Sequence, residues 1–276
     1  KEQGIIGQEI RMIEDNPDWQ IYHHLMQALY ASHPIRNGVA GTVESIATIT
    51  PEILENCHKV FYQPSNMVLC VAGSVDPREV FRIAAAAVPT GEKKTIWRDH
   101  GEPELPESAE QEVVLEMEVS APNFLLGFKT EPDSTLRGKL VGELAAELLA
   151  GESSPLYAKL YQAGLINKTF GLDFESNGET AHFVFGGESL NPAAVTEAIL
   201  NEGVRIAWNG LDDALFQRAR KAEYGARVRA INSFDHVCIQ IAKGHFAGYQ
   251  YLDFAALYDQ ITRQEVEELL RESITG

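Results

Sequence analysis

Two carboxylates near the start of the chain are spaced in a way that could serve a metal site. Glu2 and Glu9 lie seven residues apart, and seven residues make about two turns of an α-helix, so both side chains point to the same side. Apolar residues recur between Ile5 and Ile13 with helical spacing, which indicates one amphipathic helix. From spacing alone, a solvated helix face with two acids is favoured over a metal site.

The histidines do not show the spacing of a helical zinc site. There are eight: His23, His24, His33, His58, His100, His182, His236 and His245. None has another histidine four residues away, and the neighbours His23 and His24 point in different directions on a helix. No His-x-x-Glu-His occurs in the sequence, and a structural or surface role is favoured for each histidine. Because a catalytic Zn²⁺ needs three protein ligands, we expect this chain to bind Zn²⁺ no better than an ordinary acidic surface.

The composition narrows the classes of partner. The 276 residues are 45% hydrophobic and carry a formal net charge of -17, which disfavours nucleic acids and anionic lipid surfaces. No apolar run is long enough to span a membrane. The three cysteines, Cys57, Cys70 and Cys238, lack Cys-x-x-Cys spacing and are expected to be reduced thiols. The sequence therefore predicts no nucleic-acid partner, no membrane and a reducing, cytoplasmic location.

The elements around the two carboxylates are expected to be helices and one strand. Helix starts are indicated where an N-cap residue precedes a proline, at Thr50-Pro51 and Asp76-Pro77. The expected elements are a first helix ending near Asp15, helices at about 19–30, 50–61 and 76–87, and a buried strand at 67–73. No capping residue precedes the first helix, so the chain is expected to begin partway through a domain.

A charged stretch with two prolines, from Thr90 to Gln111, divides the sequence. We place a linker at residues 98–112, between the C-terminal part of a first domain (1–97) and a second domain (113–276) that is expected to lack its last strand. The elements expected in the second domain are strands at 112–120, 123–129 and 180–186 and helices at 136–149, 153–163, 192–208, 212–232 and 262–272. The predicted fold class is α+β: two similar domains, the first one truncated, with antiparallel sheets flanked by helices.

Several segments resemble the pitrilysin and insulysin family of zinc peptidases. The stretch from Glu2 to Ile10, followed by Met12 and Asp15-Asn16-Pro17, is similar to the family's helix that supplies the third zinc ligand. The most specific similarity lies within residues 61–76. The other similar segments are His33-Pro34, Gly41-Thr42, Glu44-Ser45-Ile46, Gly151 to Tyr157 and Gly164-Leu165-Ile166. The resemblance covers nearly the whole chain and is nearest in type to bacterial two-domain members of the processing-peptidase branch.

The resemblance implies roles for the two carboxylates. Enzymes of this family are inverzincins, in which a His-x-x-Glu-His helix gives two zinc histidines and a general base. Glu9 would then be the zinc ligand, and Glu2 would be a supporting acid that does not itself bind the ion but holds the site in position. The histidine helix would lie upstream of Lys1. The resemblance thus implies that the intact parent binds Zn²⁺ and hydrolyses peptides with metal-activated water. This fragment contains no catalytic residue and is expected to be inactive.

A second family feature is degenerate here. Active members carry an arginine and a tyrosine, seven residues apart, that bind substrate and stabilise the developing oxyanion. The Gly164-Leu165 similarity puts Ala163 and Phe170 at these positions, and neither side chain can donate a hydrogen bond. The resemblance therefore implies a heterodimer with a homologous peptidase-like subunit that brings the pair. If the alignment is shifted, the pair could instead come from a set of other residues: Arg218, Arg220 or Arg227 with Tyr224.

One alternative stays open. The parent could be a non-catalytic, peptidase-like subunit that recognises substrate or partner without metal. A His-x-x-Glu-His segment upstream of Glu9 would favour the enzyme, and its absence would favour the alternative.

Overall fold

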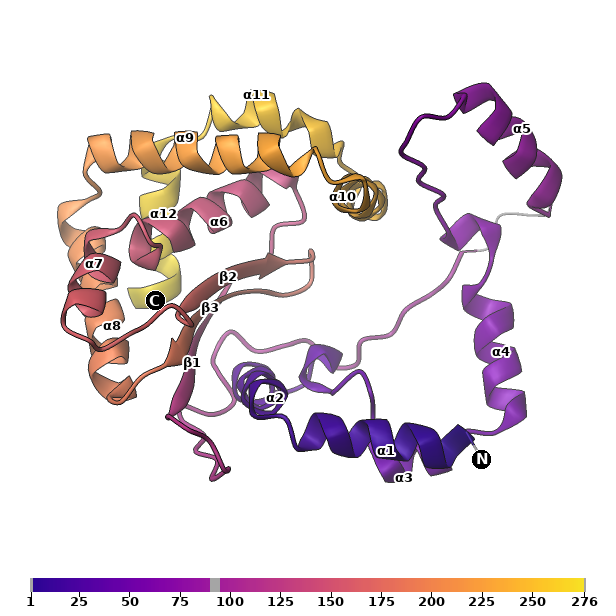
Figure 1. Ribbon diagram of the computed structural model, residues 1–276, viewed down its shortest axis with the longest axis horizontal. Helices are drawn as coiled ribbons and strands as arrows, with labels where there is room; N and C mark the ends of the chain where they lie inside the picture. Colours follow the sequence, from indigo (N-terminus) through magenta and orange to yellow (C-terminus); the bar gives the residue numbers. More distant parts are fainter. Residues whose placement is uncertain (1, 90–94, 276) are drawn as a thin grey trace.

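One antiparallel sheet of three strands organises the C-terminal half of the protein. A computed structural model describes residues 2–89 and 95–275. Within them the strands are β1 (Asn123–Thr130), β2 (Gly171–Ser176) and β3 (Ala181–Glu188), in the order β1-β3-β2 (Figure 1). The β2–β3 turn contains Gly178 at φ +86°, a backbone conformation that favours glycine. Both outer strands, β1 and β2, therefore have a hydrogen-bonded neighbour on one side only.

The two faces of this sheet are covered by different parts of the sequence. On one face, Phe183 and Phe185 pack into the main core with helix α6 (Leu136–Ala150). On the other lies α2 (Pro17–Leu29). Gly127 makes this approach close, because a Cβ there would lie 2.8 Å from a methyl carbon of Leu29. The N-terminal part of the chain thus supplies one layer of a sheet that belongs to the C-terminal part.

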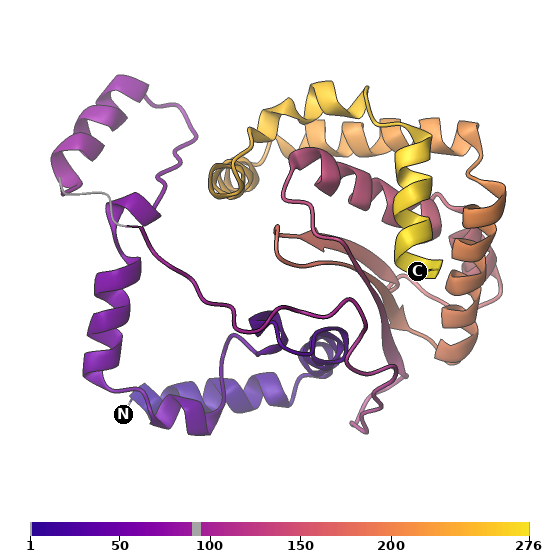
Figure 2. The same cartoon turned by 180° about the vertical axis from the view of Figure 1, so that it is seen from behind.

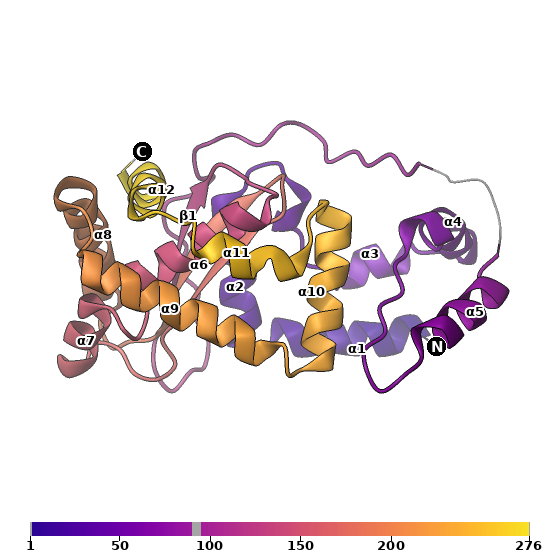
Figure 3. The ribbon, with the colours of Figure 1, turned by 90° about the horizontal axis from the view of Figure 1, so that it is seen from above.

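The remaining C-terminal helices surround α6 (Figure 3). They are α7 (Pro155–Gln162), α8 (Pro192–Asn209), α9 (Asp213–Ala230), α10 (Phe234–Ala247), α11 (Phe254–Tyr258) and α12 (Arg263–Thr275), with a short 3-10 helix η3 (Tyr251–Asp253). The centre of α6 is fully buried, with Leu140 and Leu144 both at 0% exposure. We call residues 120–275 the body of the molecule.

The N-terminal region, residues 2–119, is built differently. Its elements are α1 (Glu2–Glu14), α2, η1 (Pro34–Arg36), α3 (Val43–Ala47), α4 (Pro51–Phe61), η2 (Pro64–Asn66) and α5 (Pro77–Ala87). Its buried residues among those described are Gly7, Ile10, Met26, Leu29 and Tyr30. Helices α4 and α5 contain none of them and stand apart from the body in Figures 1 and 2.

The α+β class, with helices on both sides of an antiparallel sheet, is confirmed, and so are most of the expected helices. Thr50, Asp76 and Ser154 cap α4, α5 and α7 through side-chain oxygens that accept backbone amides. Two predicted strands, at 67–73 and 112–120, are wrong: both are described without strand structure. A strand needs a hydrogen-bonded neighbour, and the described chain provides none for either.

The division into domains is less easily judged from the fold. Residues 98–112 contain no helix or strand, as expected of a linker. The region 2–119 shows no strand among its described residues, so it offers no sheet to compare with that of the body. The division into 1–97, 98–112 and 113–276, and the similarity of the two domains, stay predictions.

Candidate functional site

Helix α1 carries the two predicted carboxylates on exposed positions. Glu2 and Glu9 are both exposed, whereas the buried residues of the helix are Gly7 and Ile10. The buried side packs on α2 and α3 (Figure 1). Glu2 and Glu9 are therefore free to meet a ligand that comes from outside the described chain.

A second contact fixes the orientation of α1. The side-chain amide of Gln3 donates to the carbonyl oxygens of Ile46 and Ile49 at 3.2 and 3.3 Å. These carbonyls lie at the end of α3, whose own start is held by a reciprocal capping pair between Thr42 and Ser45. Glu9 thus stands on a helix that is held at its first turn.

The donor set fits a family zinc site only in part. A glutamate oxygen is an ordinary Zn²⁺ ligand, but a catalytic ion takes three protein ligands. Among the described residues, Glu9 does not belong to any group of three potential ligands. The described residues can therefore supply one of the three protein ligands of such a site, Glu9.

The positions predicted to be degenerate lie at and beyond the C-terminal end of α7. Ala163 is the exposed residue after the helix, and its backbone amide donates to Lys159. Phe170 is 7% exposed and packs edge-on against Tyr157, with ring centroids 6.0 Å apart. Phe170 therefore serves the core at this position.

The other candidate pairs are largely engaged in structural contacts. Arg227 forms an ion pair with Glu143 and donates from Nε to the hydroxyl of Tyr258 at 3.1 Å. Burial disfavours the Arg227 charge, but Glu143 and Tyr258 outweigh it and raise the arginine pKa. Arg220 donates to carbonyl oxygens near the start of α12. Both guanidinium groups are held inside the body.

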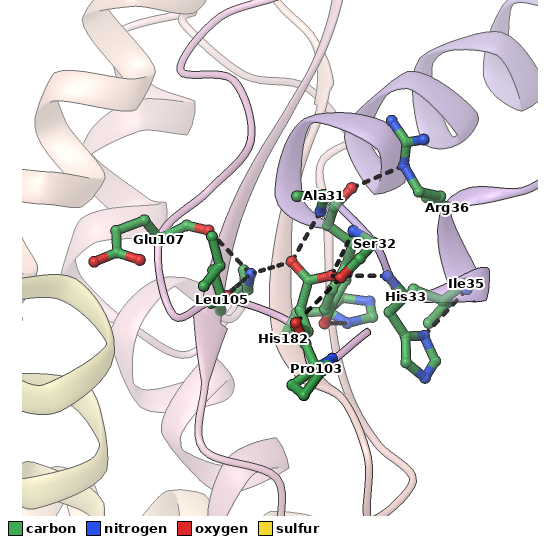
Figure 4. A network of polar contacts seen from close by, with 12 residues as sticks. Ala31, Ser32, His33, Ile35, Arg36, Pro103, Leu105, Glu107 and His182 are labelled. Atoms are coloured by element: carbon green, nitrogen blue, oxygen red, sulfur yellow. Dashed lines mark hydrogen bonds and ion pairs between the residues drawn. The ribbon is translucent and has the colours of Figure 1, made fainter. Parts of the chain in front are cut away.

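A polar network joins the linker to the end of α2 (Figure 4). The carboxylate of Glu104 accepts the backbone amides of Ala31, Ser32 and His33, each at 2.8 Å, and the ammonium of Lys129 at 3.0 Å. Burial opposes ionisation of Glu104, but these donors prevail and hold its pKa well below the usual range. The network fixes the backbone of 31–33 against both the linker and β1.

A buried histidine lies beside this network. The hydroxyl of Tyr30 lies 2.9 Å from Nδ1 of His182 on β3 and donates to the carbonyl oxygen of Ala181 at 3.3 Å. His182 is 1% exposed, and burial lowers its pKa to about 4. Its Nε2 has no partner in the described part of the chain. His182 is thus held neutral in the interface between α2 and the sheet.

The structure also assembles a group that spacing in the sequence does not reveal. One potential ligand atom each of His33, His100 and Glu179 lies within 4.8 Å of the others, the sole such group in residues 2–89 and 95–275. The three come from the loop before η1, the linker and the β2–β3 turn. Sequence separations of 67, 79 and 146 residues explain why a search for helical spacing missed them.

A long groove of about 1820 Å³ runs beside the sheet edge. It is lined by α2, residues 104–119, β1, and parts of α8 and α12. Within the described residues β1 pairs with β3 on one side and has no strand partner on the other, and its residues line this groove. No described helix is both long and apolar enough to cross a membrane.

Comparison with known proteins identifies the family. Residues 48–223 match the model described as "Peptidase M16 inactive domain". The uncharacterized zinc protease YmfH of Bacillus subtilis is 34% identical across all of this chain and 66% of its own length. A zinc protease of Streptomyces coelicolor, SCO5738, is 23% identical over 98% of this chain and 61% of its own length.

Solved structures agree with this assignment. An M16-like peptidase from Alicyclobacillus acidocaldarius superimposes with a TM-score of 0.92 at 29% identity, covering 98% of this chain and 66% of that one. The chain belongs to the M16 peptidase family, the pitrilysin-like group that the sequence resembles. It spans less than two thirds of the length of these relatives. The matched residues run across the linker, so the match does not place a domain boundary.

Proposed function

We propose that this chain is part of a zinc-dependent peptidase in which Glu9 supplies one metal ligand and Glu2 supports it. The observation that carries the proposal is the pair of exposed carboxylates two turns apart on a helix packed by its opposite side, in a chain whose relatives are named zinc proteases. The upstream inverzincin segment of the parent would bring two histidines and the general base. When bound, the zinc ion activates water and polarises the scissile carbonyl.

In this proposal, the residues of this chain hold the metal ligand in position and bind the substrate. Glu9 would present its carboxylate from a helix that Gln3 holds against α3. Glu2, on the same side, would hold Glu9 in position. The substrate is an extended peptide that adds as a strand to a sheet edge. Of the two outer strands, β1 is the one whose residues line the groove along their whole length. The enzyme acts in the cytoplasm.

Mutations of α1 in the full-length parent protein test the metal role. Glu9→Gln removes a charged ligand and is expected to abolish most zinc binding and peptide cleavage. Glu2→Gln is expected to lower activity by about 10–100-fold, as supporting groups of metal sites do. Glu14→Gln changes another exposed acid of the same helix and should leave both unchanged. Zinc content by elemental analysis and cleavage of a quenched fluorescent peptide are the measurements. Normal zinc content and activity in Glu9→Gln would contradict the proposal.

The partner follows from the positions of Ala163 and Phe170. Neither can donate a hydrogen bond to a developing oxyanion, and loss of one such donor typically lowers the rate by about 10²–10³. We therefore propose that the active form is a heterodimer with a homologous subunit that carries the arginine and tyrosine. Full-length protein should cleave weakly alone and strongly once that subunit is added. Full activity without the subunit would exclude the heterodimer but leave the role of Glu9 intact.

The alternative function is a non-catalytic subunit of the same fold. It would be consistent with the description of the matching family model as an inactive domain. Reading the sequence upstream of Glu9 in the parent gene separates the two. A His-x-x-Glu-His there supports the enzyme, and its absence supports the non-catalytic subunit.

A further inference from the structure

The three side chains of His33, His100 and Glu179 converge on one point. Nε2 of His33 lies 3.3 Å from Oε2 of Glu179, and Nδ1 of His100 contacts the same carboxylate oxygen. The two imidazole rings stand edge to face, with centroids 5.4 Å apart. Both ring nitrogens therefore lie beside one carboxylate oxygen, and the three potential ligand atoms lie within 4.8 Å of one another.

From this arrangement we propose that His33, His100 and Glu179 bind a divalent transition-metal ion of the Zn²⁺ type, at a site separate from Glu9. Imidazole and carboxylate together suit Zn²⁺ better than the all-oxygen sites of Mg²⁺ or Ca²⁺. Ligands about 2.0–2.1 Å from a tetrahedral ion lie about 3.3 Å from each other, which matches the distance between His33 and Glu179. Water would complete the sphere, since the Glu179 side chain is 51% exposed.

Two of the ligands are held in place before any ion arrives. The backbone amide of His33 donates to Glu104 at 2.8 Å, and the His33 side chain is only 14% exposed. The backbone amide of Glu179 donates to the side chain of Asn177 at 3.0 Å, which fixes the tip of the hairpin. The side chain of His100 is 37% exposed, and its backbone lies outside any helix or strand.

Binding requires a specific change at His33. Its Nδ1 accepts the backbone amide of Ile35 at 3.1 Å, so the neutral ring carries its proton on Nε2, facing Glu179. A metal on Nε2 moves that proton to Nδ1, and the amide of Ile35 then loses its acceptor. The ion therefore replaces the contacts to the carboxylate and releases the N-cap hydrogen bond of η1. The loss of this hydrogen bond should change the environment of the Ile35 amide, so its resonance can be used to detect metal binding at His33.

The site would join three parts of the chain. His33 belongs to the N-terminal region, His100 to the linker and Glu179 to the body. An ion shared among them would cross-link the linker to the sheet in addition to the Glu104 network. This departs from the sequence-based expectation that the chain binds no Zn²⁺ specifically, because that expectation considered only ligands close in sequence.

Calorimetric titration of the 276-residue chain with ZnCl₂ at pH 7.5 tests the site. One equivalent is expected to bind saturably and to raise the melting temperature. His100→Ala and Glu179→Gln should each remove the stoichiometric binding and the shift in melting temperature. His58→Ala, beside the exposed thiol of Cys57, and Glu9→Gln should leave both unchanged.

Each result decides the proposal. No saturable binding by the unmodified chain overturns it, as does binding that survives in both cluster variants. Loss of binding in His58→Ala or Glu9→Gln alone places the ion elsewhere and also overturns it. If His100→Ala does not fold, Glu179→Gln decides, since that residue lies on an exposed turn. A shift of the Ile35 amide resonance at one equivalent of Zn²⁺, absent in Glu179→Gln, supports the expected proton move.

Discussion

The body and the N-terminal region make their secondary structure by different means. In the body, α6 has ten buried residues, and every strand has a hydrogen-bonded neighbour. In the N-terminal region, α4 and α5 have no buried residue, yet both are helices with capped starts. Helices form on hydrogen bonds within one segment, whereas strands need a second segment. The same contrast explains why the apolar stretch at 67–73 is not a strand here.

The largest effect is expected from the centre of the body. Leu144 is 0% exposed, and Leu144→Ala removes its packing and leaves a cavity, so it should lower the free energy of unfolding by about 2–5 kcal/mol. Urea denaturation followed by circular dichroism measures this. A loss below about 1 kcal/mol, the typical effect of an average point mutation, would show that the body is less tightly packed than described.

Acidification should weaken the interface between α2 and the sheet. His182 is held neutral with a pKa near 4, whereas an unfolded histidine takes up a proton near pH 6.5. The unfolded state then binds more protons at this position, so the contribution of His182 to stability is full above about pH 6.5 and falls as the pH approaches 4, by up to about 3 kcal/mol. Burial raises the pKa of Glu147 to about 7, and this acts in the opposite direction over the same range.

Measuring the free energy of unfolding every half pH unit tests this. Between pH 6.5 and 4.5, His182→Gln should lose less stability than the unmodified chain; Glu147 is present in both proteins, so its titration does not contribute to the difference. His58→Ala, on exposed α4, is the control and should keep it. An unchanged slope in His182→Gln would assign the decline to other groups.

A smaller effect is expected from the network that joins the two regions. Glu104→Gln keeps the shape of the side chain but removes the charge that accepts three backbone amides and Lys129. The expected loss of stability is about 1.5–3 kcal/mol, typical of hydrogen bonds to a charged group. Glu107→Gln is a control in the same linker. Equal stability of the two variants would mean that Glu104 does not hold the regions together.

The smallest effect is expected on α4. Leu54 is 60% exposed, so Leu54→Ala should change the stability of this chain by less than about 0.5 kcal/mol. The measurement is the same denaturation used for Leu144→Ala, and the difference between the two leucines is the sharpest test of the contrast. A large loss in Leu54→Ala would reveal packing of α4 that the described contacts lack.

Much of the fold could be predicted from local signals, and the remainder depended on distant ones. The caps at Thr50, Asp76 and Ser154 gave the starts of three helices because the capping bond lies within four residues. Strand β2 (171–176) and helix α10 (234–247) were not predicted: β2 alternates apolar Leu172 and Phe174 with polar residues over only six residues, and α10 begins without a proline. The strand predicted at 112–120 is wrong because apolar and polar residues alternate there, but no neighbouring strand in the described chain pairs with this segment.

The candidate site residues also fall into a pair that local spacing predicts and a group that only the folded chain brings together. Glu2 and Glu9 could be singled out because one helix carries both. The group of His33, His100 and Glu179 could not, because only the folded chain brings a loop, the linker and a hairpin tip together. What the local sequence does indicate at His33-Pro34 is the start of a turn, where the His33 ring accepts the Ile35 amide and caps η1.

The placement of α2 on the sheet has a consequence for how the chain is made. Tyr30 meets Ala181 and His182 across 151 and 152 residues, so the helix leaves the ribosome long before its binding surface exists. At synthesis rates of about 5–20 residues per second, that delay is on the order of ten seconds. During this time the apolar side of α2, with Leu25 and Leu29, is uncovered. Nascent chains are therefore most prone to aggregate, and most in need of a chaperone, between the emergence of α2 and the completion of β3.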